Sequence, residues 1–179
     1  MSYILSLDEG TTSARAALYD AQGRRVAMES SGFTSRFPQT GWVEQDPVEI
    51  WRAQLDATRR TQAAAGIEAR SVNAIGITNQ RETTVVWDRD TGQPVAPAIV
   101  WQCRRTAAFC KELAASPQAA SITARTGLVI DAYFSGSKIA WILERVAGAR
   151  QRAQNGGLLF GNVDTWLIWN LTGGRVHVT

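Results

Sequence analysis

The chain has 179 residues, a hydrophobic fraction of 45%, a charged fraction of 20% and a net charge of +3. These values fit one large globular domain or a domain with an insertion, and the mild, scattered charge gives no argument for nucleic-acid binding. No apolar run approaches a membrane span, and the first residues resemble a strand rather than a signal peptide. His177 is the only histidine, and Cys103 and Cys110 lack metal-ligand spacing, which counts against zinc sites and Cys–His or Ser–His catalysis. We expect a cytoplasmic protein with reduced thiols.

The first twenty residues predict a hairpin with a polar turn. Tyr3–Leu7 and Ala14–Tyr19 have the composition of strands, and Gly10 permits a tight turn where a side chain would clash. Thr11 to Ser13 add three hydroxyl donors, and successive backbone N–H groups in such a turn suit a phosphate. Asp8, at the end of the first strand, is placed to hold Mg²⁺ directly or through water. The alternative is an ordinary polar hairpin, which a lone Gly-Thr-Thr would favour.

A third strand and a long helix follow. Arg25–Phe33 predicts the strand. Asp46 as N-cap, Pro47 at the first helical position and Glu49 completing a capping box mark a strong helix start. Gly66 predicts the end of this helix.

Val72–Thr78 then predicts another buried strand. Three antiparallel strands, a helix and a further strand are the order of the mixed-sheet, ribonuclease H-like (actin-like ATPase) fold. The sequence therefore predicts an α/β protein with a mixed sheet flanked by helices.

A second polar group follows that strand. Arg81 and Glu82 lie at its carboxyl end, where ligands bind in open α/β sheets, and together they can donate to and accept from vicinal hydroxyls. Trp101, after a predicted strand 85–87 and its return 95–100, could cover the carbons of such a polyol. The alternative is a surface ion pair and a core indole.

The last third is predicted to be mainly helical. Tyr133 and Phe134 lie in a loop as core anchors or ligand contacts, and Ser135 or Ser137 is expected to cap the helix that follows. The other predicted elements are helices at 106–115, 121–126 and 164–171, a strand at 158–160 and the start of a strand at 176–178.

With these motifs in view, the chain resembles the N-terminal part of bacterial glycerol kinases, members of the sugar and polyol kinase family that shares the actin-like ATPase fold. The resemblance covers essentially the whole chain. It is carried by the motifs at 8–15, 41–47, 74–86, 99–106, 126–138 and 160–169.

This resemblance implies ATP-dependent phosphorylation of a terminal hydroxyl of glycerol, with Mg²⁺. Carried over by motif, Asp8 is expected to support the Mg²⁺ ion through a bound water molecule. The nucleotide phosphates are expected to contact Thr11, Thr12, Ser13 and Arg15, with Thr11 also facing the product phosphate. Glycerol is expected to contact Arg81, Glu82, Trp101 and Tyr133.

The resemblance also implies a domain arrangement. Residues 1–179 correspond to the N-terminal, glycerol-side domain of a two-domain kinase, incomplete at its C-terminal end and with an inserted region at roughly 83–157. The catalytic base and the adenine pocket belong to the second domain, so we expect no activity from this chain alone. The complete enzyme is expected to be a cytoplasmic homo-oligomer that binds no nucleic acid and has no membrane span.

The chain departs from the family pattern at Glu9, Ala132 and Ser137, where the family usually has Gln, Pro and Thr, and Glu9 adds a negative charge near the phosphates. Two other function classes stay open. A ribonuclease H-like nuclease would need several carboxylates converging on paired metals. A non-catalytic module would bind glycerol without turnover, and within the kinases a related sugar kinase is the alternative.

Overall fold

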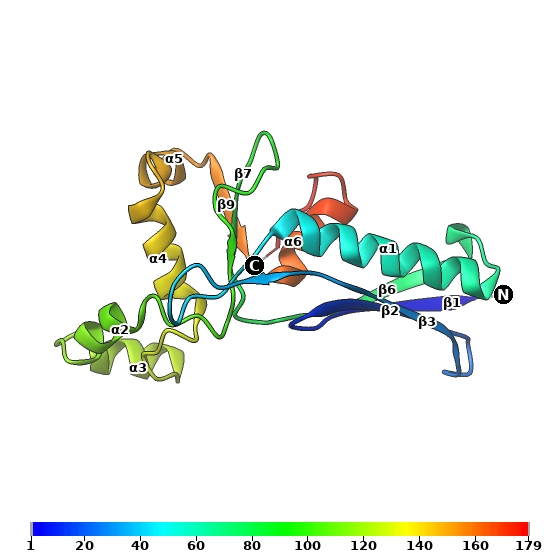
Figure 1. The fold of residues 1–179 in the computed structure, drawn as a ribbon, viewed down its shortest axis with the longest axis horizontal. Helices are drawn as coiled ribbons and strands as arrows, with labels where there is room; N and C mark the ends of the chain where they lie inside the picture. Colours follow the sequence, from blue (N-terminus) through cyan, green and yellow to red (C-terminus); the bar gives the residue numbers. More distant parts are fainter. Residues whose placement is uncertain (1, 179) are drawn as a thin grey trace. The chain divides into compact units, whose positions relative to one another are not determined.

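The computed structural model describes residues 2–178, which divide into two compact units (Figure 1). Unit 1 comprises residues 2–35, 45–81 and 163–178, and unit 2 comprises residues 36–44 and 82–162. The predicted inserted region, 83–157, falls within unit 2. Among residues 2–178 the chain passes between the units within two short strands, β4 (Ser35–Arg36) and β5 (Glu44–Gln45), and again after Arg81 and after Asn162.

Unit 1 is built on a four-stranded mixed sheet with the order β3-β2-β1-β6. Its strands are β1 (Tyr3–Glu9), β2 (Ser13–Tyr19), β3 (Arg25–Gly32) and β6 (Val72–Thr78). β2 is antiparallel to both β1 and β3, whereas β6 runs parallel to β1. A parallel pair needs a long crossover connection, and here the helix α1 supplies it. This topology confirms the predicted ribonuclease H-like fold.

Helix α1 (Pro47–Ala65) lies along one face of this sheet (Figure 1). The side chain of Asp46 accepts an N–H of the first turn, and Gly66 ends the helix with a left-handed φ of 62°, as the sequence predicts. The predicted capping box is wrong. The Glu49 carboxylate instead accepts the N–H of Thr34 at 2.9 Å, because that loop passes within its reach.

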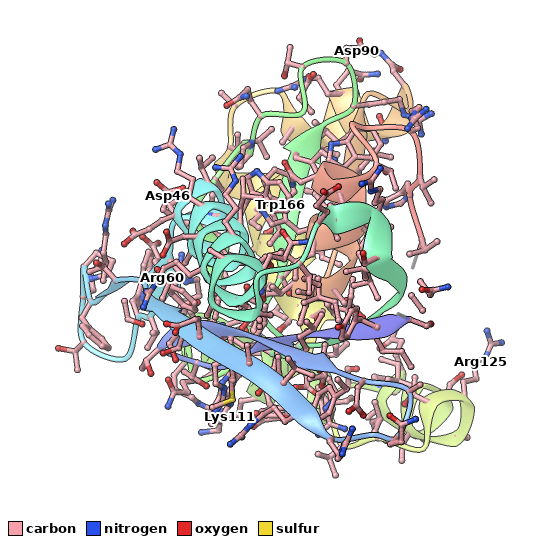
Figure 2. All side chains as sticks on the ribbon, turned by 90° about the vertical axis from the view of Figure 1, so that its right-hand side faces the viewer. Asp46, Arg60, Asp90, Lys111, Arg125 and Trp166 are labelled. Carbon is pink, nitrogen blue, oxygen red and sulfur yellow. The ribbon has the colours of Figure 1, made fainter. Side chains whose placement is uncertain are left out.

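The core of unit 1 lies between α1 and the sheet. Side chains alternate across a strand, so Leu5 and Leu7 both face α1 and pack with Ala57. Helix α6 (Val163–Leu171) joins this unit through Trp166, whose Nε1 donates to the carbonyl oxygen of Pro47 at 2.8 Å. Figure 2 shows the labelled Trp166 beside α1, which fits this hydrogen bond.

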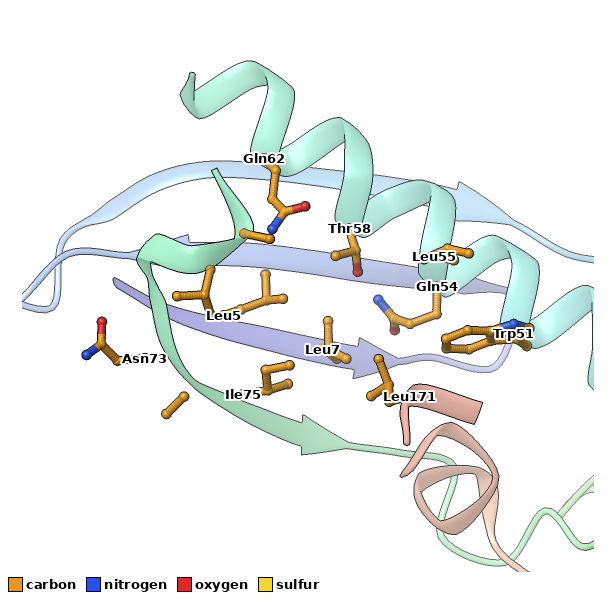
Figure 3. A pocket seen from close by; sticks show the side chains of 13 residues that line it. Leu5, Leu7, Trp51, Gln54, Leu55, Thr58, Gln62, Asn73, Ile75 and Leu171 are labelled. Carbon is orange, nitrogen blue, oxygen red and sulfur yellow. The ribbon is translucent and has the colours of Figure 1, made fainter. Parts of the chain in front are cut away.

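The prediction that β6 is buried is wrong, since most of its residues are exposed and Ile75 is 48% exposed. β6 is the outermost strand of the sheet and pairs with β1 within the described residues. An open groove of about 390 Å³ borders it (Figure 3). The groove is lined by apolar side chains of β1, α1, β6 and α6, including Leu5, Trp51 and Leu171.

Unit 2 contains the antiparallel pair β7 (Val85–Asp88) and β9 (Leu158–Gly161), as well as β8 (Ala98–Ile99). The predicted return strand over 95–100 is thus reduced to two residues. Ile99 within β8 forms a bridge to Thr84, and Pro94 before it forms a bridge to Trp87. β7 and β9 bring together parts of the chain about 70 residues apart, a pairing that no local sequence signal predicts.

Four helices complete unit 2: α2 (Ala107–Ala114), α3 (Ala119–Thr126), α4 (Ser135–Arg145) and α5 (Ala149–Gln154). The short α5 was not predicted. The predicted cap of α4 is wrong, because Phe134 occupies the N-cap position. The hydroxyl of Ser135 instead contacts Asn162, and that of Ser137 contacts Thr106 at 2.8 Å.

A buried arginine organises the core of unit 2. The guanidinium of Arg105 lies 4.0 Å from the ring centroid of Trp42 and 4.7 Å from that of Trp141. Its Nη2 forms an ion pair with the Glu44 carboxylate at 2.8 Å. A cation between two indole faces is attracted by both ring quadrupoles, so Trp42 serves the core here.

A one-turn 3₁₀ helix, η1 (Ala69–Ser71), precedes β6. The strand predicted to start at 176–178 is not formed, since these residues have no regular structure. Within residues 2–178, no helix combines the length and the apolar character needed to cross a membrane.

Candidate functional site

The turn between β1 and β2 is a tight polar hairpin turn, as the sequence predicts. The N–H of Gly10 donates to the carbonyl oxygen of Ser13 at 3.0 Å and so closes the turn. A Cβ at Gly10 would lie only 3.1 Å from that same oxygen, which explains the need for glycine. Thr12 is exposed at the tip, and Thr11 and Ser13 are partly exposed beside it. We call Asp8, Thr11, Thr12, Ser13 and Arg15 the phosphate-side cluster.

The side-chain amides of two buried glutamines donate hydrogen bonds to backbone carbonyls of this turn. Gln80, directly after β6, donates from Nε2 to the carbonyl oxygen of Gly10 at 2.8 Å. Gln45 donates from Nε2 to the carbonyl oxygen of Thr11 at 2.7 Å. Both glutamines are buried, so these hydrogen bonds fix two successive carbonyls of the turn in a site screened from water. The sequence reasoning missed these roles, although a polar amide that follows a strand was a usable signal.

Asp8 and Arg15 face each other across the hairpin and form an ion pair at 2.7 Å. Their side chains are 39% and 49% exposed, so the pair contributes little to stability and can open at small cost. The exposed carboxylate, with hydroxyl oxygens in the turn beyond it, is a hard-oxygen donor set of the kind that holds Mg²⁺ through water. The residues present therefore fit such an ion.

The side chain of Glu9 is buried and does not extend toward the turn. It points to the same face of β1 as Leu5 and Leu7, is 2% exposed, and has no hydrogen-bond partner for either carboxylate oxygen among the described residues. Burial, and secondarily the charge of Asp8, raise the pKa of Glu9 to about 8. The expectation of a negative charge near the phosphates is therefore wrong at neutral pH, where the carboxyl is mostly protonated.

The predicted polyol contacts fall in unit 2, except for Arg81, which is the last residue of its segment of unit 1. We call Glu82, Trp101 and Tyr133 the polyol-side cluster. The rings of Trp101 and Tyr133 pack edge to face with their centroids 5.9 Å apart. Arg81 is exposed, and neither it nor Glu82 takes part in any ion pair within residues 2–178. The surface ion pair that was the alternative is thus not formed.

The backbone around Tyr133 is held on both sides. Its N–H donates to Asp131 Oδ1 at 2.7 Å, and Arg104 pairs with both oxygens of that carboxylate at 2.7 and 3.1 Å. The hydrogen bond from Arg104 lowers the pKa of Asp131, which is therefore charged at neutral pH. On the other side, the Tyr133 carbonyl accepts a hydrogen bond from Lys138. Sequence reasoning missed Lys138, because nothing near it in the chain indicates a buried partner.

The nuclease alternative requires clustered carboxylates. Within residues 2–178 there is no group of three or more His, Cys, Asp or Glu side chains that could hold a metal ion together. Glu9, the one acidic neighbour of Asp8 in the chain, points into the core. The described part of the chain thus lacks the arrangement on which that alternative depends.

Comparison with known proteins places the chain in a family. The model of the N-terminal domain of the FGGY family of carbohydrate kinases matches residues 3–179. The chain is 59% identical over all of its 179 residues to glycerol kinase 2 of Thermotoga maritima, and 57% identical over 177 residues to glycerol kinase of Alkaliphilus metalliredigens. It spans about 36% and 35% of the lengths of these two relatives.

Solved structures of kinases are also similar to this chain. The structure of Plasmodium falciparum glycerol kinase with ADP matches 97% of this chain and 35% of its own with a TM-score of 0.89 at 34% identity. Gluconate kinase of Lactobacillus acidophilus matches 94% of this chain and 32% of its own with a TM-score of 0.80 at 21% identity, which shows a shared fold alone.

Proposed function

Because the chain belongs to the FGGY family of carbohydrate kinases, we propose that it is the N-terminal, polyol-side part of a kinase that transfers the γ-phosphoryl group of ATP to glycerol. The product is sn-glycerol 3-phosphate. The identity of 59% to a glycerol kinase over the whole chain supports this assignment. The observation that carries it is the polyol-side cluster, in which a carboxylate, an indole and a phenol occur in one unit. Arg81 directly precedes the Glu82 of this cluster in the chain.

The phosphate-side cluster binds the nucleotide. The hydroxyls of Thr11, Thr12 and Ser13 donate to phosphate oxygens, and Arg15 neutralises part of their charge. Asp8 would hold Mg²⁺ through water, and the ion would supply further neutralisation of the phosphate charge. Phosphoryl transfer asks the protein chiefly for positioning and charge stabilisation, which this turn is built to provide.

The polyol-side cluster binds glycerol. Arg81 donates to glycerol hydroxyls, the carboxylate of Glu82 accepts from them, and the hydroxyl of Tyr133 can do either. The face of Trp101 covers the carbon atoms. In the reaction, a terminal hydroxyl oxygen forms a bond to the γ-phosphorus, the bond to the leaving ADP breaks, and the hydroxyl proton passes to a base.

We place that base, and the adenine pocket, in a second domain outside residues 1–179. No residue of this chain is assigned as the catalytic base. Without the second domain the reacting groups are open to water, where electrostatic contacts weaken. We therefore expect the 179-residue chain alone to phosphorylate no glycerol, and we expect the complete kinase to act in the cytoplasm as a homo-oligomer.

The test is a chimera in which residues 1–179 replace the matching 36% of the Thermotoga maritima enzyme. A coupled assay would compare glycerol, xylulose and gluconate as acceptors, with the unaltered Thermotoga enzyme as control. We expect phosphorylation of glycerol with a clear preference over both other acceptors. A preference for xylulose or gluconate would assign the chain to a sugar kinase, and turnover by the 179 residues alone would place the base within them.

A further inference from the structure

Lys138 is the most deeply buried charged side chain that the proposed function leaves unused. It lies in the first turn of α4, its exposed fraction is 0%, and it extends into unit 2 rather than toward solvent. Lysine is almost never fully buried unless its ammonium group is paired. The position of its partners therefore decides what this residue does.

The partners are two backbone carbonyls. The Nζ of Lys138 donates to the carbonyl oxygen of Glu82 at 2.7 Å and to that of Tyr133 at 2.5 Å. Glu82 lies 56 residues from Lys138 in the chain, so the ammonium joins two segments that the chain itself does not connect closely. Both segments carry a member of the polyol-side cluster.

We infer that Lys138 is a positioning residue for the polyol, holding Glu82 and Tyr133 at a fixed separation through their carbonyl oxygens. This inference rests on the proposed function for the identity of the ligand. A hydrogen bond to a backbone carbonyl restrains the Cα from which the side chain extends. A charged donor between two such carbonyls therefore limits the separation of the backbone positions from which the carboxylate and the phenol extend.

The surroundings support this role. The side of Tyr133 opposite Lys138 is fixed by Asp131, whose carboxylate accepts the Tyr133 N–H at 2.7 Å. Burial lowers the pKa of Lys138 to about 8, which leaves the ammonium mostly charged at neutral pH. A charged hydrogen bond is roughly twice as strong as a neutral one, so the ammonium is a firm link between the two carbonyls.

A hydrogen bond of Thr83 connects the Glu82 segment to Trp101 as well. The backbone N–H of Trp101 donates to Thr83 Oγ1 at 3.3 Å, and Thr83 directly follows Glu82. A shift of the Glu82 segment would therefore also reach Trp101. All three members of the polyol-side cluster thus depend on the segment that Lys138 holds.

The experiment compares Lys138→Met with Thr106→Val in the chimera. Methionine keeps the length and the apolar stem of lysine but has no donor. Thr106 is also buried and contacts α4 through Ser137, yet it contacts neither carbonyl, so its replacement controls for the general loss of a buried hydrogen bond. Each protein is assayed for the KM of glycerol, the KM of ATP and kcat.

We expect Lys138→Met to raise the glycerol KM roughly tenfold or more, since a lost charged hydrogen bond is typically of that size. The ATP KM should change by less than about twofold on the same scale. A merely structural loss would lower the active fraction and hence kcat, without raising the glycerol KM. Thr106→Val should behave in that second way.

Hydrogen exchange gives a readout independent of activity. In the 179-residue chain, Lys138→Met should speed exchange at the amides around residues 82–84 and 133–135 and leave the amides of β1 and β2 unchanged. An unchanged glycerol KM in an active chimera would overturn the inference while leaving the proposed function intact. An inactive unmutated chimera would count against the proposed function, and the exchange data would then still decide whether Lys138 holds the two segments.

A folding defect is also informative. If Lys138→Met fails to fold, Lys138→Gln, which retains donors on a shorter side chain, replaces it. Failure of both variants to fold would mean that Lys138 serves the stability of unit 2 as a whole, which would overturn the positioning role.

Discussion

The Nε2 of Gln80 donates a hydrogen bond of 2.8 Å to the carbonyl oxygen of Gly10, across a separation of 70 residues. Gly10 begins the turn of the phosphate-side cluster, and Gln80 immediately precedes Arg81. The end of β6 is therefore tied to the loop that we propose for the nucleotide phosphates. Since β1 and β6 run parallel in neighbouring positions, both segments leave the sheet at the same edge.

We predict that Gln80→Met destabilises unit 1. The substitution keeps the length of the side chain but leaves the Gly10 carbonyl without this buried donor. A lost buried partner costs about 1–3 kcal/mol in the free energy of unfolding. Urea denaturation measures this loss, with Gln39→Met at an exposed glutamine as the control. Equal midpoints for the two variants would show that the hydrogen bond contributes nothing.

A second prediction concerns the hydroxyls of the turn. Replacing Thr11 and Thr12 together with Val keeps β-branching but removes two donors to phosphate. We expect the chimera to fold normally and its kcat to fall by about 10²-fold or more, because such donors act on charge in the transition state. Circular dichroism checks the fold and the coupled assay checks the rate. A native rate would assign the turn a purely structural role.

The third prediction separates the two substrates. Arg81 is exposed and forms no ion pair within the described residues, so its guanidinium is available to a ligand. We expect Arg81→Ala in the chimera to reduce kcat/KM for glycerol by the equivalent of about 1.5–3 kcal/mol, the usual value of a hydrogen bond to a charged group. The KM of ATP should stay close to its original value. Steady-state kinetics with each substrate varied in turn makes the comparison.

If glycerol use were unaffected and ATP use impaired, Arg81 would belong with the phosphate-side cluster. Arg89→Ala is a suitable control, because Arg89 is also exposed and lies in the turn after β7.

The fourth prediction uses the buried carboxyl of Glu9. Its pKa is raised from 4.5 to about 8 on folding. The folded state therefore keeps a proton that the unfolded state releases, so the free energy of unfolding falls as the pH rises from about 4.5 to about 8. The contribution of the protonated carboxyl is fully present below the lower value and is lost as the pH passes through the upper one.

Glu9→Gln places a neutral side chain of nearly the same shape in that site. We expect this variant to be more stable than the original chain at pH 8 and similar to it near pH 4.5. These two pH values correspond to the raised pKa of Glu9 in the folded chain, about 8, and to its ordinary pKa of 4.5. Glu112→Gln, at an exposed position, should leave the pH dependence unchanged. Urea denaturation across this pH range decides, and parallel curves for the original chain and Glu9→Gln would contradict the prediction.

Local signals in the sequence determined much of unit 1. The turn at Gly10, the N-cap Asp46, and the stop at Gly66 each depend on residues a few positions apart, and all three were predicted correctly. The order of the strands followed from the same reasoning. Such features are readable because backbone geometry and capping are decided within one or two turns of the chain.

The motifs also indicated the residues of both clusters, but the resemblance to a known family, rather than spacing, gave them their roles. Signals that combine two local features were less reliable. The capping box of Glu49 and the cap of α4 both failed, because a loop and a neighbouring helix supplied competing partners for those side chains.

Tertiary structure alone decided the contacts between distant segments. The inward position of Glu9, the link from Gln80 to Gly10 and the link from Lys138 to Glu82 join residues that no local pattern connects. The free energy of a buried polar group depends on whether a partner reaches it in the folded chain, and that partner can come from anywhere in the sequence. The sequence by itself determined which residues are present at the site, whereas the packing of distant segments decided which of them are charged, held or exposed.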